Sequence, residues 1–174
     1  MNGGEKKSAV SWTEWLVIGL IIGLLGIVAI WAIGSARTTA RDAVRLSDIR
    51  QVQAGLELYF NDHNVYPEVD TTLPLGQATT LCLGDDGFSG NCGSSQYLYL
   101  ESVAMPPSAG LKNSACAGVD DTYCYLAVDA SYRVQFELEK RQTLLDLPSG
   151  LNCATETGLE AGACSLPSGF EVTE

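Results

Sequence analysis

The sequence predicts an α+β protein in which a long N-terminal α-helix, membrane-spanning in its first half, packs on a small antiparallel β-sheet with disulfide-stapled loops. Three patterns lead to this fold class. An uncharged apolar run covers residues 15–36, apolar residues recur every three or four positions over residues 46–60, and apolar and polar residues alternate over residues 132–138. These patterns are typical of a membrane helix, an amphipathic helix and a half-buried strand, in that order.

The apolar run is long enough to cross a bilayer. As a helix, residues 15–36 would extend about 33 Å, which matches the hydrocarbon core of a membrane. Gly19 and Gly23 form a G-x-x-x-G pair, which lets a second helix approach closely, although glycines are also common in membrane helices in general. Upstream, the basic pair Lys6-Lys7 favours an N-terminus held in the cytoplasm.

The membrane helix is expected to continue into an amphipathic half over residues 37–63. No proline interrupts residues 33–61, and Pro67 supplies a stop. One face carries the apolar residues that we expect to meet the core: Leu46, Ile49, Val52, Leu56, Tyr59 and Phe60.

Three arginines share another face of this helix, namely Arg37, Arg41 and Arg45. We expect them to meet acidic lipid head groups or acidic faces of neighbouring subunits. A solvated face partly neutralised by Asp42 and Asp48 is the alternative.

Residues 64–174 are expected to form an acidic globular headgroup rich in β-structure. The alternating residues 132–138 and the aromatic-rich residues 123–128 predict a hairpin that turns at residues 129–131, and residues 96–100 predict a third strand. Residues 68–95 are rich in turn formers, and the tail after Pro148 is expected to be irregular. From residue 51 on, four basic side chains stand against seventeen acidic ones, so nucleic acid is a poor partner.

Six cysteines all follow the apolar run, and an even number in a small exported domain indicates disulfides. Because cysteines that are near neighbours in the chain close short loops most readily, we expect the bridges Cys82–Cys92, Cys116–Cys124 and Cys153–Cys164. Free thiols in a cytosolic protein are the alternative, which the membrane segment disfavours.

The start of the chain resembles the type IV pilin and pseudopilin family. In residues 9–18 (AVSWTEWLVI), Ala9 is the small residue after a short basic leader, and Glu14 stands five positions later. The resemblance implies that a prepilin peptidase cuts between Ala9 and Val10, that the new amine of Val10 is methylated, and that Glu14 pairs with the N-terminal amine of a neighbouring subunit. A second stretch, residues 41–67 ending in Tyr66-Pro67, looks like the juxtamembrane helix and its exit in the same family.

This resemblance implies a domain order of leader peptide (1–9), transmembrane and assembly helix (10–36), amphipathic continuation (37–63) and headgroup (64–174). It implies a structural subunit of a pilus or pseudopilus, inserted as a prepilin and assembled through its N-terminal helix, with Gly19 and Gly23 in the helix contact. The partners would be other copies and related pilins, the peptidase, the inner-membrane assembly machinery and the membrane. The protein would lie in the cell membrane before assembly and in an extracellular or periplasmic filament afterwards.

Two other functions fit the same sequence. One is an uncleaved, signal-anchored extracellular binding domain, and the other is a domain released by signal peptidase after Ala36. An enzyme is not expected, since the common catalytic motifs are absent and the one histidine, His63, lies at the predicted helix exit. No cofactor is expected. Calcium is a minor possibility at the oxygen-bearing side chains of two segments: Asp85, Asp86, Ser89 and Asn91, or Asp120 and Asp121.

Overall fold

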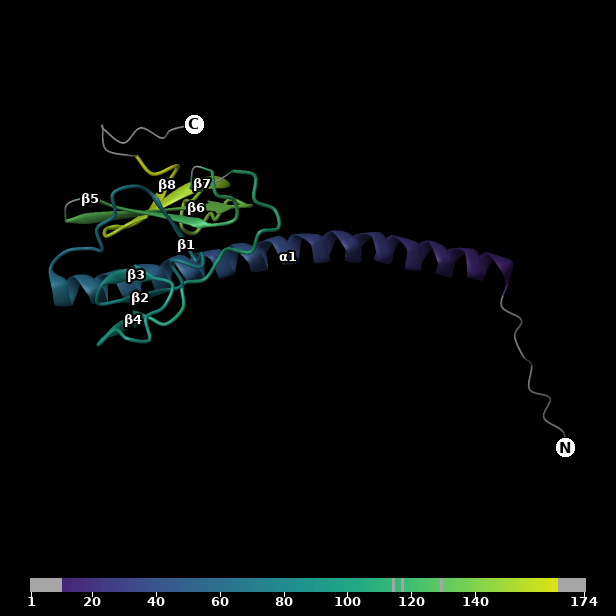
Figure 1. Ribbon diagram of the computed structural model, residues 1–174. Helices are drawn as coiled ribbons and strands as arrows, with labels where there is room; N and C mark the ends of the chain where they lie inside the picture. The colour runs from purple at the N-terminus through teal and green to yellow at the C-terminus, as the bar shows by residue number, and fades with distance from the viewer. Residues whose placement is uncertain (1–10, 114, 117, 129, 166–174) are drawn as a thin grey trace. The chain divides into compact units, whose positions relative to one another are not determined.

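The computed structural model describes residues 11–113, 115–116, 118–128 and 130–165. Its elements are one helix, α1 (Trp12–His63), and eight strands. The chain divides into two compact units, one up to Arg37 and one from Thr38 onward (Figure 1). The described part of the first unit is Ser11 and the N-terminal half of α1.

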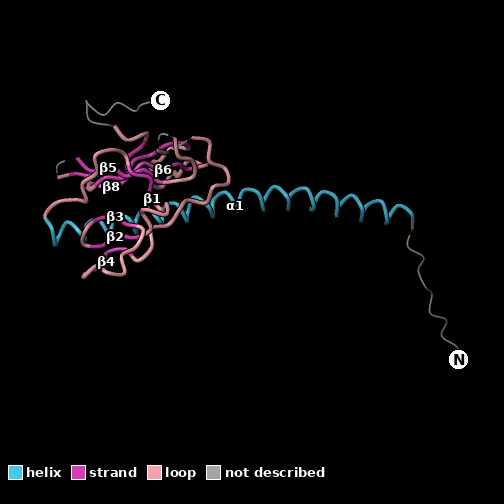
Figure 2. The backbone as a smooth tube through the Cα atoms, in the orientation of Figure 1, coloured by secondary structure: helices cyan, strands magenta, loops and turns pink. Residues whose placement is uncertain are grey.

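The second unit combines the C-terminal half of α1 with two antiparallel sheets (Figure 2). The larger sheet has the strand order β1-β5-β6-β7-β8 and the smaller sheet the order β3-β2-β4. Their bounds are β1 (Leu73–Leu75), β2 (Cys82–Gly84), β3 (Gly87–Ser89), β4 (Leu98–Leu100), β5 (Tyr123–Val128), β6 (Ser131–Leu138), β7 (Gly150–Thr155) and β8 (Gly158–Ala161). Every pair of neighbouring strands is antiparallel.

The core of the second unit lies where α1 meets these sheets. The helix contributes the apolar face that the sequence predicted, and Ile49 and Leu56 are fully buried. Opposite them, β5 and β6 contribute large side chains that are buried almost completely: Tyr123, Tyr125, Tyr132, Val134 and Phe136. The smaller sheet reaches the helix at Gly55, where a Cβ atom would overlap the side chain of Leu100 on β4. A glycine is therefore needed at this close approach.

The helix ends where the sequence predicted. Asn64 adopts a left-handed conformation (φ 59°) and donates its backbone N–H to the carbonyl oxygen of Phe60 at 2.7 Å, which closes the last turn. His63 stacks on Tyr59 with 4.1 Å between the ring centroids, and its Nδ1 lies 3.0 Å from the Tyr59 carbonyl oxygen. The histidine thus lies at the helix end, as the sequence predicted.

All three predicted disulfides are present. Cys82–Cys92 ties β2 to the loop between β3 and β4, Cys116–Cys124 holds a loop on β5, and Cys153–Cys164 fastens the end of the described chain to β7. The strands at residues 123–128 and 131–138 are confirmed as a paired hairpin, and the third predicted strand is present but shorter, over β4.

Two parts of the β-structure prediction were wrong. The tail after Pro148 is not irregular, because β7 and β8 pair there and extend the larger sheet. The turn-rich residues 68–95 contain β1, β2 and β3, and the structure has two sheets where the sequence predicted one. The strands that were missed are mostly only three residues long or rich in glycine, so they carry no alternating pattern to detect.

Candidate functional site

The N-terminal half of α1 is the candidate functional site because nothing in the described part of its own chain covers it. Its most apolar window has a mean hydropathy of 2.9 and is 0% buried, which makes α1 long and apolar enough to cross a membrane. Large side chains are exposed around the whole circumference, from Trp12 (78% exposed) to Trp31 (80%). A continuous apolar surface of this size needs lipid or other helices around it.

Glu14 is held at the first turn of this helix. Its Oε2 accepts a hydrogen bond from the backbone N–H of Ser11 at 2.7 Å, and the hydroxyls of Ser11 and Thr13 lie 3.0 Å apart. Since Trp12 is the first helical residue, Ser11 occupies the N-cap and Glu14 the third helical position, and this bond is the glutamate half of a capping box. A carboxylate there also lies at the positive end of the helix dipole.

The sequence pattern S-x-x-E signals this cap, and we had assigned Glu14 only to pairing between subunits. The predicted cleavage residues Ala9 and Val10 lie outside the described residues. Ser11 is the first described residue, and the Glu14 carboxylate is bonded to its N–H. The carboxylate is therefore fixed within one residue of the predicted new N-terminus.

Gly19 and Gly23 leave a part of the helix surface without side chains. A Cβ atom added at either glycine would meet nothing within 4 Å. Neither glycine is therefore needed for packing among the described residues. What they provide is a shallow strip on which the backbone of another helix can lie closely.

Within the second unit, a buried ion cluster fastens the turns of α1 that follow Thr38 to the loops and strands around them. The Arg45 side chain is fully buried, and its guanidinium donates to Asp42 at 2.8 Å and to Glu139 at 2.9 Å. It also donates to the carbonyl oxygens of Pro107 and Ala109. One arginine thereby joins α1, the end of β6 and the loop that contains residues 107–109.

Arg41 completes this cluster with two hydrogen bonds of 2.6 Å to the Glu139 carboxylate. These bonds are the main reason that the pKa of the Glu139 carboxyl is lowered, with Arg45 adding to the effect against desolvation. Asp42 in turn accepts the backbone N–H groups of Glu139 and Lys140, both at 2.9 Å. Both acidic groups are thus compensated by cations and by backbone donors.

The cluster corrects our interpretation of the arginine face. Arg41 and Arg45 bind Glu139 and Asp42 inside the second unit, so they are neither a solvated face nor a free lipid-binding face. Asp48 does not neutralise them, because its carboxylate accepts the hydroxyl of Tyr123 at 2.9 Å. Arg37 is exposed and precedes this part of the helix.

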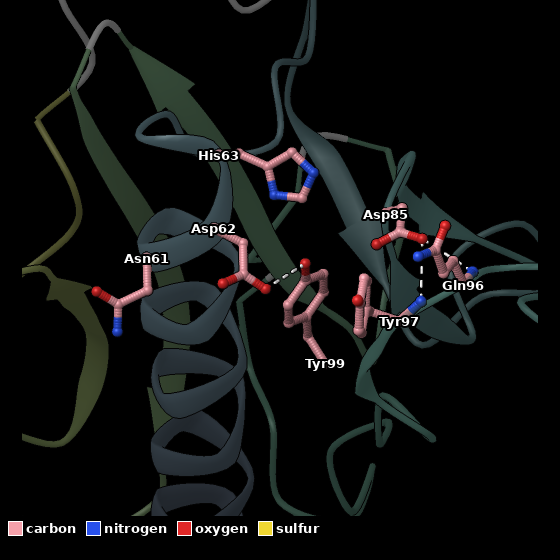
Figure 3. Close-up of a pocket in the computed structure, with 7 residues that line it drawn as sticks. All are labelled: Asn61, Asp62, His63, Asp85, Gln96, Tyr97 and Tyr99. Atoms are coloured by element: carbon pink, nitrogen blue, oxygen red, sulfur yellow. Dashed lines mark hydrogen bonds between the residues drawn. The ribbon is translucent and has the colours of Figure 1, made fainter.

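A polar groove of about 730 Å³ opens at the C-terminal end of α1 (Figure 3). The Tyr99 hydroxyl donates to Asp62 at 2.9 Å, and desolvation together with this bond raises the pKa of Tyr99 to about 12. Asp85 accepts the backbone N–H groups of Gln96 and Tyr97 at 2.8 and 3.0 Å. The groove is lined by Asn61, Asp62, His63, Asp85, Gln96, Tyr97 and Tyr99.

Three of the residues considered for calcium, Asp85, Ser89 and Asn91, use side-chain oxygens in hydrogen bonds to nearby backbone groups. Besides Asp85, Ser89 bonds with the backbone of Asn91, and the Asn91 side chain accepts the N–H of Gly93 at 2.9 Å. Within the described ranges, no group of three or more His, Cys, Asp or Glu side chains is arranged to hold a metal ion. Asp120 and Asp121 line a small depression beside Lys112 and Asn113.

The chain was compared with protein-family models, with curated proteins and with solved structures, and none of the three comparisons gave a match.

Proposed function

We propose that this chain is a structural subunit of a type IV pilus or pseudopilus-like filament. It is inserted in the membrane as a precursor, cut between Ala9 and Val10, methylated at Val10 and assembled through the first half of α1. The single observation that carries the proposal is an apolar helix, exposed on all sides, that begins with a fixed carboxylate. In a filament, neighbouring helices replace lipid around it.

The two special features of this helix have matching roles. Gly19 and Gly23 provide the close approach between helices. Glu14 fixes the axial position of one helix relative to the next, because a carboxylate buried among apolar helices needs a cation beside it. The amine of Val10 on an adjacent subunit supplies that cation. The folded second unit, with its three disulfides, remains outside the helix bundle as the displayed headgroup.

The mature N-terminus is the first test. N-terminal sequencing and intact mass of the membrane-extracted protein should give a chain that begins at Val10 with one added methyl group. A chain that begins at Met1 fits a signal-anchored protein, and one that begins at Arg37 fits a released domain. Either of these results would reject assembly through the first half of α1 as proposed.

Glu14→Gln separates the charge of Glu14 from its capping bond. A glutamine at the third helical position still accepts the Ser11 N–H, so the helix start is kept while the negative charge is lost. We expect insertion and cleavage as in the wild type, with filament yield lower by about tenfold or more, because removing one partner of a buried charge pair costs about 3–5 kcal/mol. Sheared filaments and membrane-bound precursor are both quantified by immunoblot.

Glu57→Gln on the second half of α1 is the matched control, because Glu57 is an exposed glutamate of the same helix. Its filament yield should stay at the wild-type level. If Glu14→Gln also assembles at that level, the carboxylate is a helix cap only, and the charge-pairing mechanism is wrong.

A second candidate function is a signal-anchored extracellular binding domain. The groove at the end of α1 favours it, because two carboxylates and two tyrosines offer a surface for a cationic ligand (Figure 3). This function does not explain the first half of α1 beyond tethering. An uncut, monomeric protein that begins at Met1 would favour it over the filament.

A further inference from the structure

The turn between β6 and β7 exposes two leucines in an ordered conformation. Gln142 and Leu147 close the turn through two backbone hydrogen bonds, Gln142 N–H to Leu147 at 2.8 Å and Leu147 N–H to Gln142 at 3.2 Å. Leu147 is fully buried, whereas Leu144 at the tip is 99% exposed and Leu145 38% exposed. The turn therefore presents its apolar tip outward from a fixed base. Residues 140–146 are called the Leu144 loop below.

The Leu144 loop is fastened to the part of α1 that directly follows the apolar run. Asp42 accepts the backbone N–H groups of Glu139 and Lys140, at the base of the loop. Asp42 lies six residues after Ala36, the end of the uncharged run. Six residues extend about 9 Å as a helix and at most about 20 Å in any conformation. A bilayer that holds the apolar run up to Ala36 consequently has its head groups within about 20 Å of Asp42, the residue to which the base of the loop is bonded.

The charges around the loop suit an anionic surface. Lys140 and Arg141 are part of the loop, in a chain whose formal net charge is −11. Arg141 pairs with Asp146 at 2.9 Å, but both side chains are largely exposed, so this pair is weak and easily exchanged for a lipid phosphate. The remainder of the headgroup is strongly acidic and is repelled by such a surface.

We propose that the Leu144 loop is a membrane contact: its leucine tip inserts among the head groups of an anionic bilayer, while Lys140 and Arg141 exchange their side-chain contacts in the protein for lipid phosphates. Leucines beside basic residues form the usual amphipathic pattern of interfacial segments. The contact orients the headgroup on the membrane before assembly and is given up when the subunit leaves the bilayer. It rests on the membrane insertion in our proposed function and does not depend on filament formation.

Fluorescence quenching in vesicles tests the contact with the full chain. A single added cysteine, Thr143→Cys, carries an environment-sensitive NBD label and leaves both leucines in place. The labelled protein is reconstituted at low density in phosphatidylcholine vesicles, with or without phosphatidylglycerol, and the quencher is doxyl-labelled lipid. We expect a blue-shifted emission that the lipid quenches when phosphatidylglycerol is present, and a loss of this quenching in Leu144→Ser and in the double variant Lys140→Gln/Arg141→Gln.

Two further label positions separate the possible failures. Leu98→Cys labels an exposed position on β4 and should show emission as in water. Leu24→Cys labels the apolar run and should be quenched in both kinds of vesicle. If the Leu24 label is not quenched, membrane insertion itself is wrong, and the loop proposal falls with it.

If the Leu24 label is quenched while the Thr143 label stays water-like, only the loop proposal is overturned. A Thr143 label that shifts to the blue without quenching by lipid would indicate a protein neighbour, and would likewise overturn it.

Discussion

At the scale of single residues, Arg45 is a charged side chain that is stable in the core only because several acceptors compensate its charge. It is fully buried, and four acceptors on three segments converge on its guanidinium, while its Nε has no hydrogen-bond partner among the described residues. The planar guanidinium reaches several acceptors at once, which the point charge of a lysine cannot reproduce. The cost of burying this charge is offset only as long as all partners remain in place.

Arg45→Met tests this dependence. Methionine approximates the volume of the side chain but leaves the carboxylates of Asp42 and Glu139 with less compensation in a buried site. We expect the free energy of unfolding of the second unit to fall by about 3–5 kcal/mol, as for other broken buried ion pairs. Urea unfolding of the full chain in detergent, followed by near-ultraviolet circular dichroism, measures it.

Arg50→Met is the control, because Arg50 is an exposed arginine on the same helix. Its free energy of unfolding should change by no more than about 0.5 kcal/mol. Equal losses in the two variants would mean that the cluster contributes nothing specific.

Asp48 and Glu139 make the stability of the fold depend on pH in opposite directions. Burial raises the pKa of the Asp48 carboxyl, against the hydrogen bond from Tyr123, so its contribution to stability is largest at low pH and declines as the pH rises above about 4, the unfolded value. The lowered pKa of Glu139 acts in the other direction, since its contribution is present above about pH 4 and is lost on acidification.

Asp48→Asn removes the first of these dependences. The amide oxygen still accepts the Tyr123 hydroxyl, but no charge forms at neutral pH. We expect the variant to be more stable than the wild type near neutral pH, with a difference that shrinks toward pH 4 and below, as measured by urea unfolding at a series of pH values. A difference that is independent of pH would show that Asp48 does not titrate in this way.

At the scale of elements, the sequence predicted the helix and the strands whose own residues follow a regular pattern of apolar and polar side chains. The second half of α1 was readable because Ile49, Val52 and Leu56 repeat at helical spacing, and β6 because its residues alternate. The strands β1 to β3 and β8 were not, since these strands of three or four residues exist through pairing with neighbours more than through their own preference. The disulfides were predictable because each closes a short loop.

The candidate site, like the fold, could be predicted from the sequence only where its residues lie close together in the chain. The apolar run and its glycines were predicted from one local pattern, whereas the Ser11 to Glu14 cap was not predicted, although its S-x-x-E signal lies in the same stretch. The Arg45–Glu139 pair joins residues 94 positions apart, and the attachment of the Leu144 loop to Asp42 joins residues 98 apart. Such contacts follow from the tertiary fold, so the sequence showed the arginines but not their partners.

At the scale of the whole molecule, the chain consists of two units suited to different solvents. The described part of the first unit buries nothing of its own apolar window, whereas the second has a continuous core, a buried ion cluster and three disulfides. The ion cluster, the core and the disulfides are formed entirely by residues after Thr38. Association and folding are therefore expected to be separable properties of the two units.

A fragment of residues 38–174 tests this separation. We expect it to fold without detergent, form all three disulfides, remain monomeric and unfold with a midpoint close to that of the second unit in the full chain, because its core and ion cluster are complete. Circular dichroism, mass spectrometry without reduction and light scattering measure these properties. Arg45→Met in the fragment should lower its stability as it does in the full chain. An unfolded fragment would mean that the first half of α1 contributes to the fold of the second unit. A fragment that associates would place an association surface on the second unit itself.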